Sequence, residues 1–160
     1  MEYQQIMDFI QSNFALGAVA ILLFYVLAFA FFAIGYILDS LCLVKIFRAY
    51  NYPNPYYAFI PFYNLYILAN LTCDENFKLG EFKIEKKYFI WWWVIYLLIS
   101  YIVPFKIISF IIKVICLGFC YHNGIKQIDN SYDNKILSYA AAIFPIILWF
   151  VVLPKKIGVE

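Results

Sequence analysis

Long uncharged segments recur along this chain and alternate with short polar ones. The longest covers residues 14–38, 25 residues without a charged side chain. An α-helix rises about 1.5 Å per residue, so about 20 apolar residues cross the ~30 Å hydrocarbon core of a bilayer. Residues 1–13 contain no Lys or Arg, unlike the basic start of a cleaved signal peptide. We therefore expect 14–38 to be a permanent membrane span, continued by an amphipathic helix toward Tyr50.

Three further apolar runs predict membrane-spanning helices of similar character. The first of these runs begins with Trp91–Trp93, a residue type that favours the level of the lipid headgroups. Pro104 follows it, so we expect a hairpin between this span and the next. The last run contains Pro145, which a membrane helix tolerates. These three spans are expected at residues 88–103, 107–122 and 136–153.

The segment 55–72 is apolar enough to span, but it contains two prolines and two asparagines. If it crossed, the Lys and Arg residues outside the spans would divide 5 to 6 between the two sides. If it dips in and returns, they divide 8 to 3, which fits the excess of positive charge on the cytoplasmic side. We therefore expect a re-entrant or interfacial helix that is broken around Pro61 and shielded by the spans.

This arrangement predicts a topology for the whole chain. The polar segments 73–87 and 123–135 are expected to be cytoplasmic loops, and both termini are expected to be extracytoplasmic. The fold class is an all-α integral membrane bundle, a single domain over residues 1–160 with four transmembrane helices and one re-entrant or interfacial helix.

Composition supports a membrane protein. Apolar residues make up 66% of the chain and charged residues 14%, against about 45–50% and about 25% in soluble proteins. Such a chain has too few polar side chains to cover a water-soluble globule. The formal net charge is only +2, which argues against nucleic acid as a partner. A lipid bilayer is therefore the expected surrounding, in the cell membrane.

One motif resembles a known family. The segment Ile60-Pro61-Phe62-Tyr63-Asn64-Leu65-Tyr66 is similar to the I-P-x-Y-N-x-Y hallmark of bacterial multi-pass membrane proteins of unknown function. Phe47-Arg48-Ala49 precedes it, and a Trp-rich block and Phe144-Pro145-Ile146 follow it. The resemblance implies a multi-pass membrane architecture and no established activity.

Pro61, Tyr63 and Asn64 are candidate binding residues. A proline break at membrane depth leaves backbone carbonyls without helical partners, and an amide beside them can present further polar atoms to a substrate, an ion or a partner helix. In the alternative interpretation, Asn64 caps the returning helix and Tyr63 anchors at the interface.

Lys113 is the fourth candidate binding residue, because it is the only charge well inside a predicted span. A charge at that depth costs several kcal/mol unless it is paired or hydrated. Asp39, a tyrosine hydroxyl or a carbonyl freed by a proline are candidate partners. The alternative is that the long Lys113 side chain snorkels to the interface.

Motifs of catalysis and metal binding are missing from the sequence. There is no phosphate-binding loop, zinc-protease motif, nucleophile elbow or dinucleotide fingerprint, so we expect no enzyme activity and no cofactor. Cys116 and Cys120 share a helix face, but no C-x-x-C motif occurs and His122 lies off that face. Buried packing thiols are expected at all four cysteines, and no metal site.

These observations favour a small non-enzymatic subunit or interaction partner in a membrane complex, packed against copies of itself or against another membrane protein. Small residues in the first span, among them Ala28 and Gly35, suit close contact between helices. The alternative is an oligomeric channel or transporter with a polar site near Lys113 and the Pro61 break. A membrane-embedded enzyme would need Tyr63, Asn64, Asn70 and Asp39 to converge in one cavity, and it is the least favoured interpretation.

Overall fold

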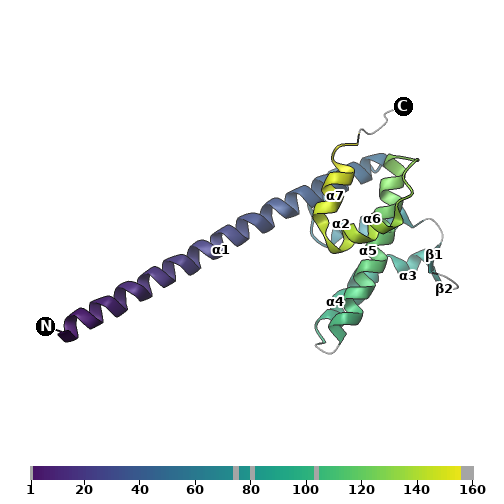
Figure 1. The fold of residues 1–160 in the computed structure, drawn as a ribbon. Helices are drawn as coiled ribbons and strands as arrows, with labels where there is room; N and C mark the ends of the chain where they lie inside the picture. The colour runs from purple at the N-terminus through teal and green to yellow at the C-terminus, as the bar shows by residue number, and fades with distance from the viewer. Residues whose placement is uncertain (1, 74–75, 80–81, 103–104, 156–160) are drawn as a thin grey trace. The chain divides into compact units, whose positions relative to one another are not determined.

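The computed structural model describes residues 2–73, 76–79, 82–102 and 105–155 (Figure 1). It divides into two units, residues 1–36 and residues 37–160. Most of the described backbone is helical, which confirms the prediction of a mostly helical chain. The elements are α1 (Glu2–Ala49), the 3-10 helix η1 (Pro55–Phe59), α2 (Tyr63–Thr72), β1 (Asn76–Leu79), β2 (Phe82–Glu85), α3 (Lys86–Phe89), α4 (Trp92–Ser100), α5 (Lys106–Ile128), α6 (Lys135–Ile143) and α7 (Pro145–Val152).

Two helices are long and apolar enough to cross a membrane. They are the Leu16–Ala49 part of α1 and the whole of α5. The first contains the predicted span 14–38 together with its expected amphipathic continuation, and the second contains the predicted span 107–122. By length and composition, therefore, two of the four predicted spans are present as continuous helices.

The predicted span 88–103 is not one helix in the structure. It contains the end of α3 and the nine residues of α4, separated by a turn in which Trp91 N–H bonds to the Tyr88 carbonyl. Nine residues rise about 14 Å, roughly half of the hydrocarbon core. The expected turn at Pro104 lies outside the described residues.

The prediction that residues 136–153 form a single helix is also wrong, because the structure has two helices there, α6 and α7. Phe144 is extended, with φ −118° and ψ 92°, and it separates α6 from α7. The cause is Pro145, because the proline ring clashes with a helical residue before it and the proline has no N–H to continue the ladder. Pro145 instead occupies the first turn of α7, where a missing N–H costs nothing.

Helix α5 continues to Ile128, six residues into the segment 123–135 that was expected to be a loop. Gly124 lies inside this helix, buried against Ile46 of α1, and a Cβ there would be 2.9 Å from a methyl carbon of Ile46. This glycine allows α5 to pack closely against α1.

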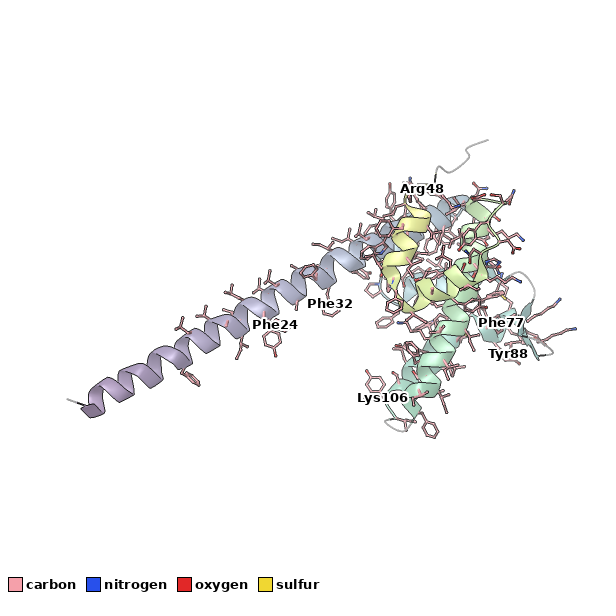
Figure 2. All side chains as sticks on the ribbon, in the orientation of Figure 1. Phe24, Phe32, Arg48, Phe77, Tyr88 and Lys106 are labelled. Atoms are coloured by element: carbon pink, nitrogen blue, oxygen red, sulfur yellow. The ribbon has the colours of Figure 1, made fainter. Side chains whose placement is uncertain are left out.

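The segment 73–87, expected to be a loop, contains an antiparallel hairpin of β1 and β2 with Phe77 opposite Ile84 and Lys78 opposite Lys83. Phe77 is buried and its ring lies 4.8 Å from Phe119 of α5 and 4.7 Å from Phe89 of α3 (Figure 2). Alternation places Phe77 inward and Lys78 outward, which is the pattern of a half-buried strand.

The core of residues 37–160 surrounds α5. Helix α4 packs along α5, and the Ser109 hydroxyl donates to the Tyr96 carbonyl at 3.2 Å between them. Helix α6 packs on α5 where Gly118 meets the ring of Tyr139. The largest fully buried side chains come from the end of α1, from α2, α3, α5 and α7: Phe47, Phe89, Ile46, Ile67, Leu68, Ile125, Leu148 and Val152.

Candidate functional site

The proline-containing motif forms a tight turn between η1 and α2. Tyr63 N–H bonds to the Pro61 carbonyl at 2.7 Å, and Phe62 between them has φ 64° and ψ −42°. This is a γ-turn with positive φ, a rare conformation that costs a non-glycine residue about 1–3 kcal/mol. The ring of Phe62 stacks on Trp93 with centroids 6.0 Å apart, which helps to hold the turn. The strained backbone places the next side chain, Tyr63, at the start of α2.

Asn64 is buried just after this turn. Its side-chain amide donates to the Ala58 carbonyl at 3.1 Å, and its backbone N–H donates to the Ile60 carbonyl at 3.0 Å. The side chain thus ties η1 to α2 across the break. The alternative that Asn64 caps the returning helix is wrong, because the N-cap position of α2 is Phe62 and no side chain caps it, while the Asn64 amide donates to η1.

Tyr63 lines an aromatic pocket. We use this name for the open cavity of about 460 Å³ lined by Tyr63, Tyr66, Trp91 and Trp93, which joins α2 to the start of α4. The rings of Tyr63 and Tyr66 are nearly parallel with centroids 5.9 Å apart, and Tyr66 lies 5.9 Å from Trp91. Trp91 is 6.3 Å from Trp93. The four rings therefore form a continuous aromatic lining.

Two more tyrosines extend this cluster. The ring of Tyr57 lies edge-on to Tyr63 at 5.6 Å. Burial raises the pKa of the Tyr52 phenol, and its interaction with the Tyr63 hydroxyl raises it further. Tyr52 therefore stays protonated and neutral near pH 7, as does an ordinary tyrosine. Tyr57 and Tyr52 therefore lie next to Tyr63, which itself lines the aromatic pocket.

Lys113 lies partly buried on α5, and the structure gives it an electrostatic partner. Asp39 on α1 is attracted by the Lys113 charge and accepts a hydrogen bond of 2.6 Å from the Trp149 indole N–H of α7. The ion pairs of the described residues are Lys87–Glu85 and Lys155–Asp129, so Lys113 and Asp39 do not form a salt bridge there. Asp39 was the first partner expected for Lys113.

Lys45 has a role that the sequence pattern did not predict. Its ammonium donates to the carbonyls of Leu153, Lys155 (2.9 Å) and Val152 (3.4 Å). These carbonyls lie at or just beyond the C-terminus of α7, where helical carbonyls lack intrahelical partners and positive charge is favourable. A lysine among the buried residues of an amphipathic helix indicates that its ammonium has a partner inside the protein. The sequence does not show that this partner is the C-terminus of α7.

The loop between α5 and α6 is fixed by Asp129. Its carboxylate pairs with Lys155 and accepts a hydrogen bond of 3.0 Å from the Ser131 backbone N–H. The Lys155 ammonium also lies 5.3 Å from the ring centroid of Tyr132. The Lys155 and Ser131 hydrogen bonds lower the pKa of Asp129 to about 2. Asp129 is therefore ionised at neutral pH and holds the segment after α7 to this loop.

The lowered pKa predicts an acid-sensitive contact. Because the folded-state pKa of about 2 lies below the ordinary Asp value of 3.8, the contact stabilises the fold fully above about pH 4 and is lost as pH falls toward 2. In Asp129→Asn, the melting temperature is expected to fall at pH 7, and the gap from wild type to shrink between pH 4 and pH 2. Thermal melts over pH 2–7, with exposed Asp133→Asn as control, measure this; a gap that does not depend on pH would contradict it.

All four cysteines are buried, which agrees with the packing role expected for them. Within the part of the chain that the structure describes, no three His, Cys, Asp or Glu side chains are grouped so as to hold a metal ion.

Comparison of the chain with protein-family models, curated proteins and solved structures finds no match. The family suggested by the Ile60–Tyr66 motif stays a prediction. Functional conclusions therefore rest on the described residues themselves.

Proposed function

We propose that this chain is a small multi-pass membrane protein that acts as a non-enzymatic subunit or interaction partner in a membrane complex. The observation that carries the proposal is the surface of α1 within residues 14–36. Seven consecutive residues, Ile21–Leu27, are large and apolar, and each is 57–69% exposed. Seven residues make two helical turns, so apolar side chains point in every direction around the axis.

A helix that is apolar on all sides needs an apolar surrounding, either a bilayer or other protein. Taken by itself, the unit of residues 1–36 is a single helix and offers none. The residues that follow, 37–160, have a core of their own. Phe24 and Phe32 extend from this helix as bare rings (Figure 2). Lipid and a neighbouring transmembrane helix are the surroundings that suit such a surface.

One face of this helix suits a partner helix better than lipid. At 100° per residue, Gly17, Ala28 and Gly35 lie within about 20° of one another around the axis. Small side chains there let a second helix backbone approach closely, which drives association in membranes through packing. Val19 and Val26 lie on the opposite face and serve as matched controls.

Two details of the body favour a subunit over a pore. One N–H of the Asn64 side-chain amide is hydrogen-bonded to the Ala58 carbonyl, so this amide joins η1 to α2. The charge of Lys113 favours the ionised carboxylate of Asp39, which also accepts the hydrogen bond from the Trp149 indole. Both polar features therefore have partners within the chain.

The small-residue face gives the test. The double variant Ala28→Leu and Gly35→Leu is expected to weaken association in detergent at least about tenfold, because two leucines hold the helices apart by the width of a side chain. Val19→Leu with Val26→Leu should leave it unchanged. Light scattering of the purified full-length chain measures self-association, and photo-crosslinking from position 28 in intact membranes measures a foreign partner.

The proposal is supported if the chain forms a stable complex of defined stoichiometry, either with copies of itself or with one foreign membrane protein. Only Ala28→Leu with Gly35→Leu should disrupt that complex. A monodisperse monomer that forms no crosslink from position 28 would overturn it. Equal effects of the two double variants would also contradict the assignment of this face.

A further inference from the structure

The lining of the aromatic pocket has an unusual composition for a binding site. All four side chains are Tyr or Trp, and none is charged. The cavity of about 460 Å³ lies within the range of small-molecule sites, about 300–1,000 Å³. Trp91 is 53% exposed and Tyr63 39% exposed, so the pocket opens to its surroundings. A ligand can therefore reach the rings directly.

Aromatic faces carry partial negative charge, and they attract cations that come within about 6 Å. Elsewhere in the chain, cations of the protein itself occupy such faces: Arg48 over Tyr56 at 5.6 Å and Lys87 over Tyr88 at 4.8 Å. Among the described residues, no Lys or Arg lies over a ring of the aromatic pocket in this way. No cation of the described residues therefore competes for these rings, although Phe62 covers one face of Trp93 and the rings of Tyr63 and Tyr66 stack on each other.

The kind of cation follows from what the lining lacks. A primary ammonium has three N–H donors and loses hydrogen bonds to water when it enters a site without enough acceptors. The side chains of the aromatic pocket include no carboxylate and no amide oxygen. A quaternary ammonium has no N–H, so it gives up no hydrogen bonds and gains the attraction of several rings.

The pocket is also held in shape before any ligand binds. Phe62 stacks on Trp93 from the γ-turn. The i, i+3 spacing on α2 places Tyr63 beside Tyr66 at an interplanar angle of 10°. Strained backbone of this kind is found at binding sites, where it fixes a side chain in advance. Little order is then lost when a ligand enters.

We propose that the aromatic pocket binds a quaternary ammonium group such as that of choline, either free or as a lipid headgroup. The proposal does not depend on whether the chain has a protein partner. It assigns to Tyr63 a role in binding through its ring. It adds Tyr66, Trp91 and Trp93, which were not among the binding residues predicted from the sequence.

Choline and its uncharged isostere 3,3-dimethyl-1-butanol provide a sharp test, because they differ in charge but hardly in shape. Saturation-transfer NMR on the purified full-length chain in maltoside micelles detects the nine equivalent methyl protons of each probe, with empty micelles as the blank. Choline is expected to bind saturably and at least about fivefold more tightly than the isostere. A fivefold ratio corresponds to about 1 kcal/mol of cation–π attraction.

Variants locate the site. Trp91→Leu and Tyr66→Leu are expected to weaken choline binding at least about fivefold, and Trp91→Phe to lie between Trp91→Leu and wild type, because it keeps a smaller ring. Tyr88→Leu is the matched control, an exposed aromatic residue outside the lining. Glycerophosphocholine binding more tightly than choline would indicate the lipid headgroup as the source, and the reverse order would indicate the free cation.

Equal binding of choline and the uncharged isostere would overturn the proposal and assign the pocket to apolar ligands such as acyl chains. Wild-type choline binding in Trp91→Leu and Tyr66→Leu would also overturn it, as would no saturable binding of choline to the folded chain. A thermal melt of each variant shows that it is folded.

Discussion

Replacing Gly118 with alanine is expected to destabilise the fold by about 1–3 kcal/mol, because it inserts a methyl group into closely packed helices. A Cβ at this position would lie 2.3 Å from the Tyr139 Cδ1 atom and 2.9 Å from two further ring atoms. These atoms include the first carbon of the ring, which cannot swing aside without moving the whole side chain. Helices α5 and α6 must then separate, or Tyr139 must leave its place.

Two other glycines provide matched controls for this prediction. A Cβ added at Gly17 on α1 would meet no atom of the chain within 4 Å. Gly17 lies on the small-residue face proposed for association, so the comparison is made with the dissociated chain, where Gly17→Ala is expected to be neutral or slightly stabilising, by less than about 1 kcal/mol. Gly124→Ala should be intermediate, since the group that it meets is the flexible side chain of Ile46 at 2.9 Å. The melting temperatures in detergent should therefore rank Gly17→Ala highest, then Gly124→Ala, then Gly118→Ala.

A double variant identifies the cause of the loss. If the clash with Tyr139 is responsible, Gly118→Ala should cost little in a Tyr139→Ala background, where the ring is gone. An equal loss of stability from Gly118→Ala in the wild-type and Tyr139→Ala backgrounds would show that contact with the Tyr139 ring is not the reason for a glycine at position 118.

Lys45→Met is expected to lower stability by about 2–3 kcal/mol. The substitution keeps an apolar stem of similar length but removes the ammonium that donates to the Val152, Leu153 and Lys155 carbonyls. Hydrogen bonds to a charged group contribute about 1.5–3 kcal/mol, and the carbonyls at the end of α7 would lose their donor in a partly buried place. Thermal melting in detergent measures the change.

The exposed Lys126 of α5 is the matched control, and Lys126→Met should stay within about 0.5 kcal/mol of wild type. Lys45→Arg should recover part of the loss, because it keeps the charge but not the position of the donor. Hydrogen exchange should speed up first in α7 of Lys45→Met, where the cap is lost. Equal effects of Lys45→Met and Lys126→Met would contradict a capping role for Lys45.

The local physics of the chain is sufficient to predict many of its elements. A run of 25 uncharged residues is helical in any apolar surrounding, since the backbone has no water to bond to. The helices over 14–38 and 107–122 and the break near Pro61 follow from such local rules. The same rules found Tyr63, Asn64 and Lys113 by their polarity among apolar neighbours.

The sequence-based predictions were wrong where one local composition is compatible with two different backbone structures. The run 136–153 is uncharged throughout, and this composition fits either one kinked span or two short helices. The extended backbone at Phe144 decides for two short helices. The four aromatic residues of the pocket come from separate parts of the chain, Tyr63 and Tyr66 from one and Trp91 and Trp93 from another. Their meeting requires the packing of α2 beside the start of α4.

The sequence by itself determined that the chain is largely helical, rich in apolar residues and interrupted at Pro61, because hydrophobicity and proline act locally. Only the tertiary structure decided that Lys45 caps α7, that Gly118 accommodates Tyr139 and that four rings line one cavity. Each of these contacts joins residues distant in sequence, and a contact of that kind depends on how whole helices pack. The candidate site belongs to this second group.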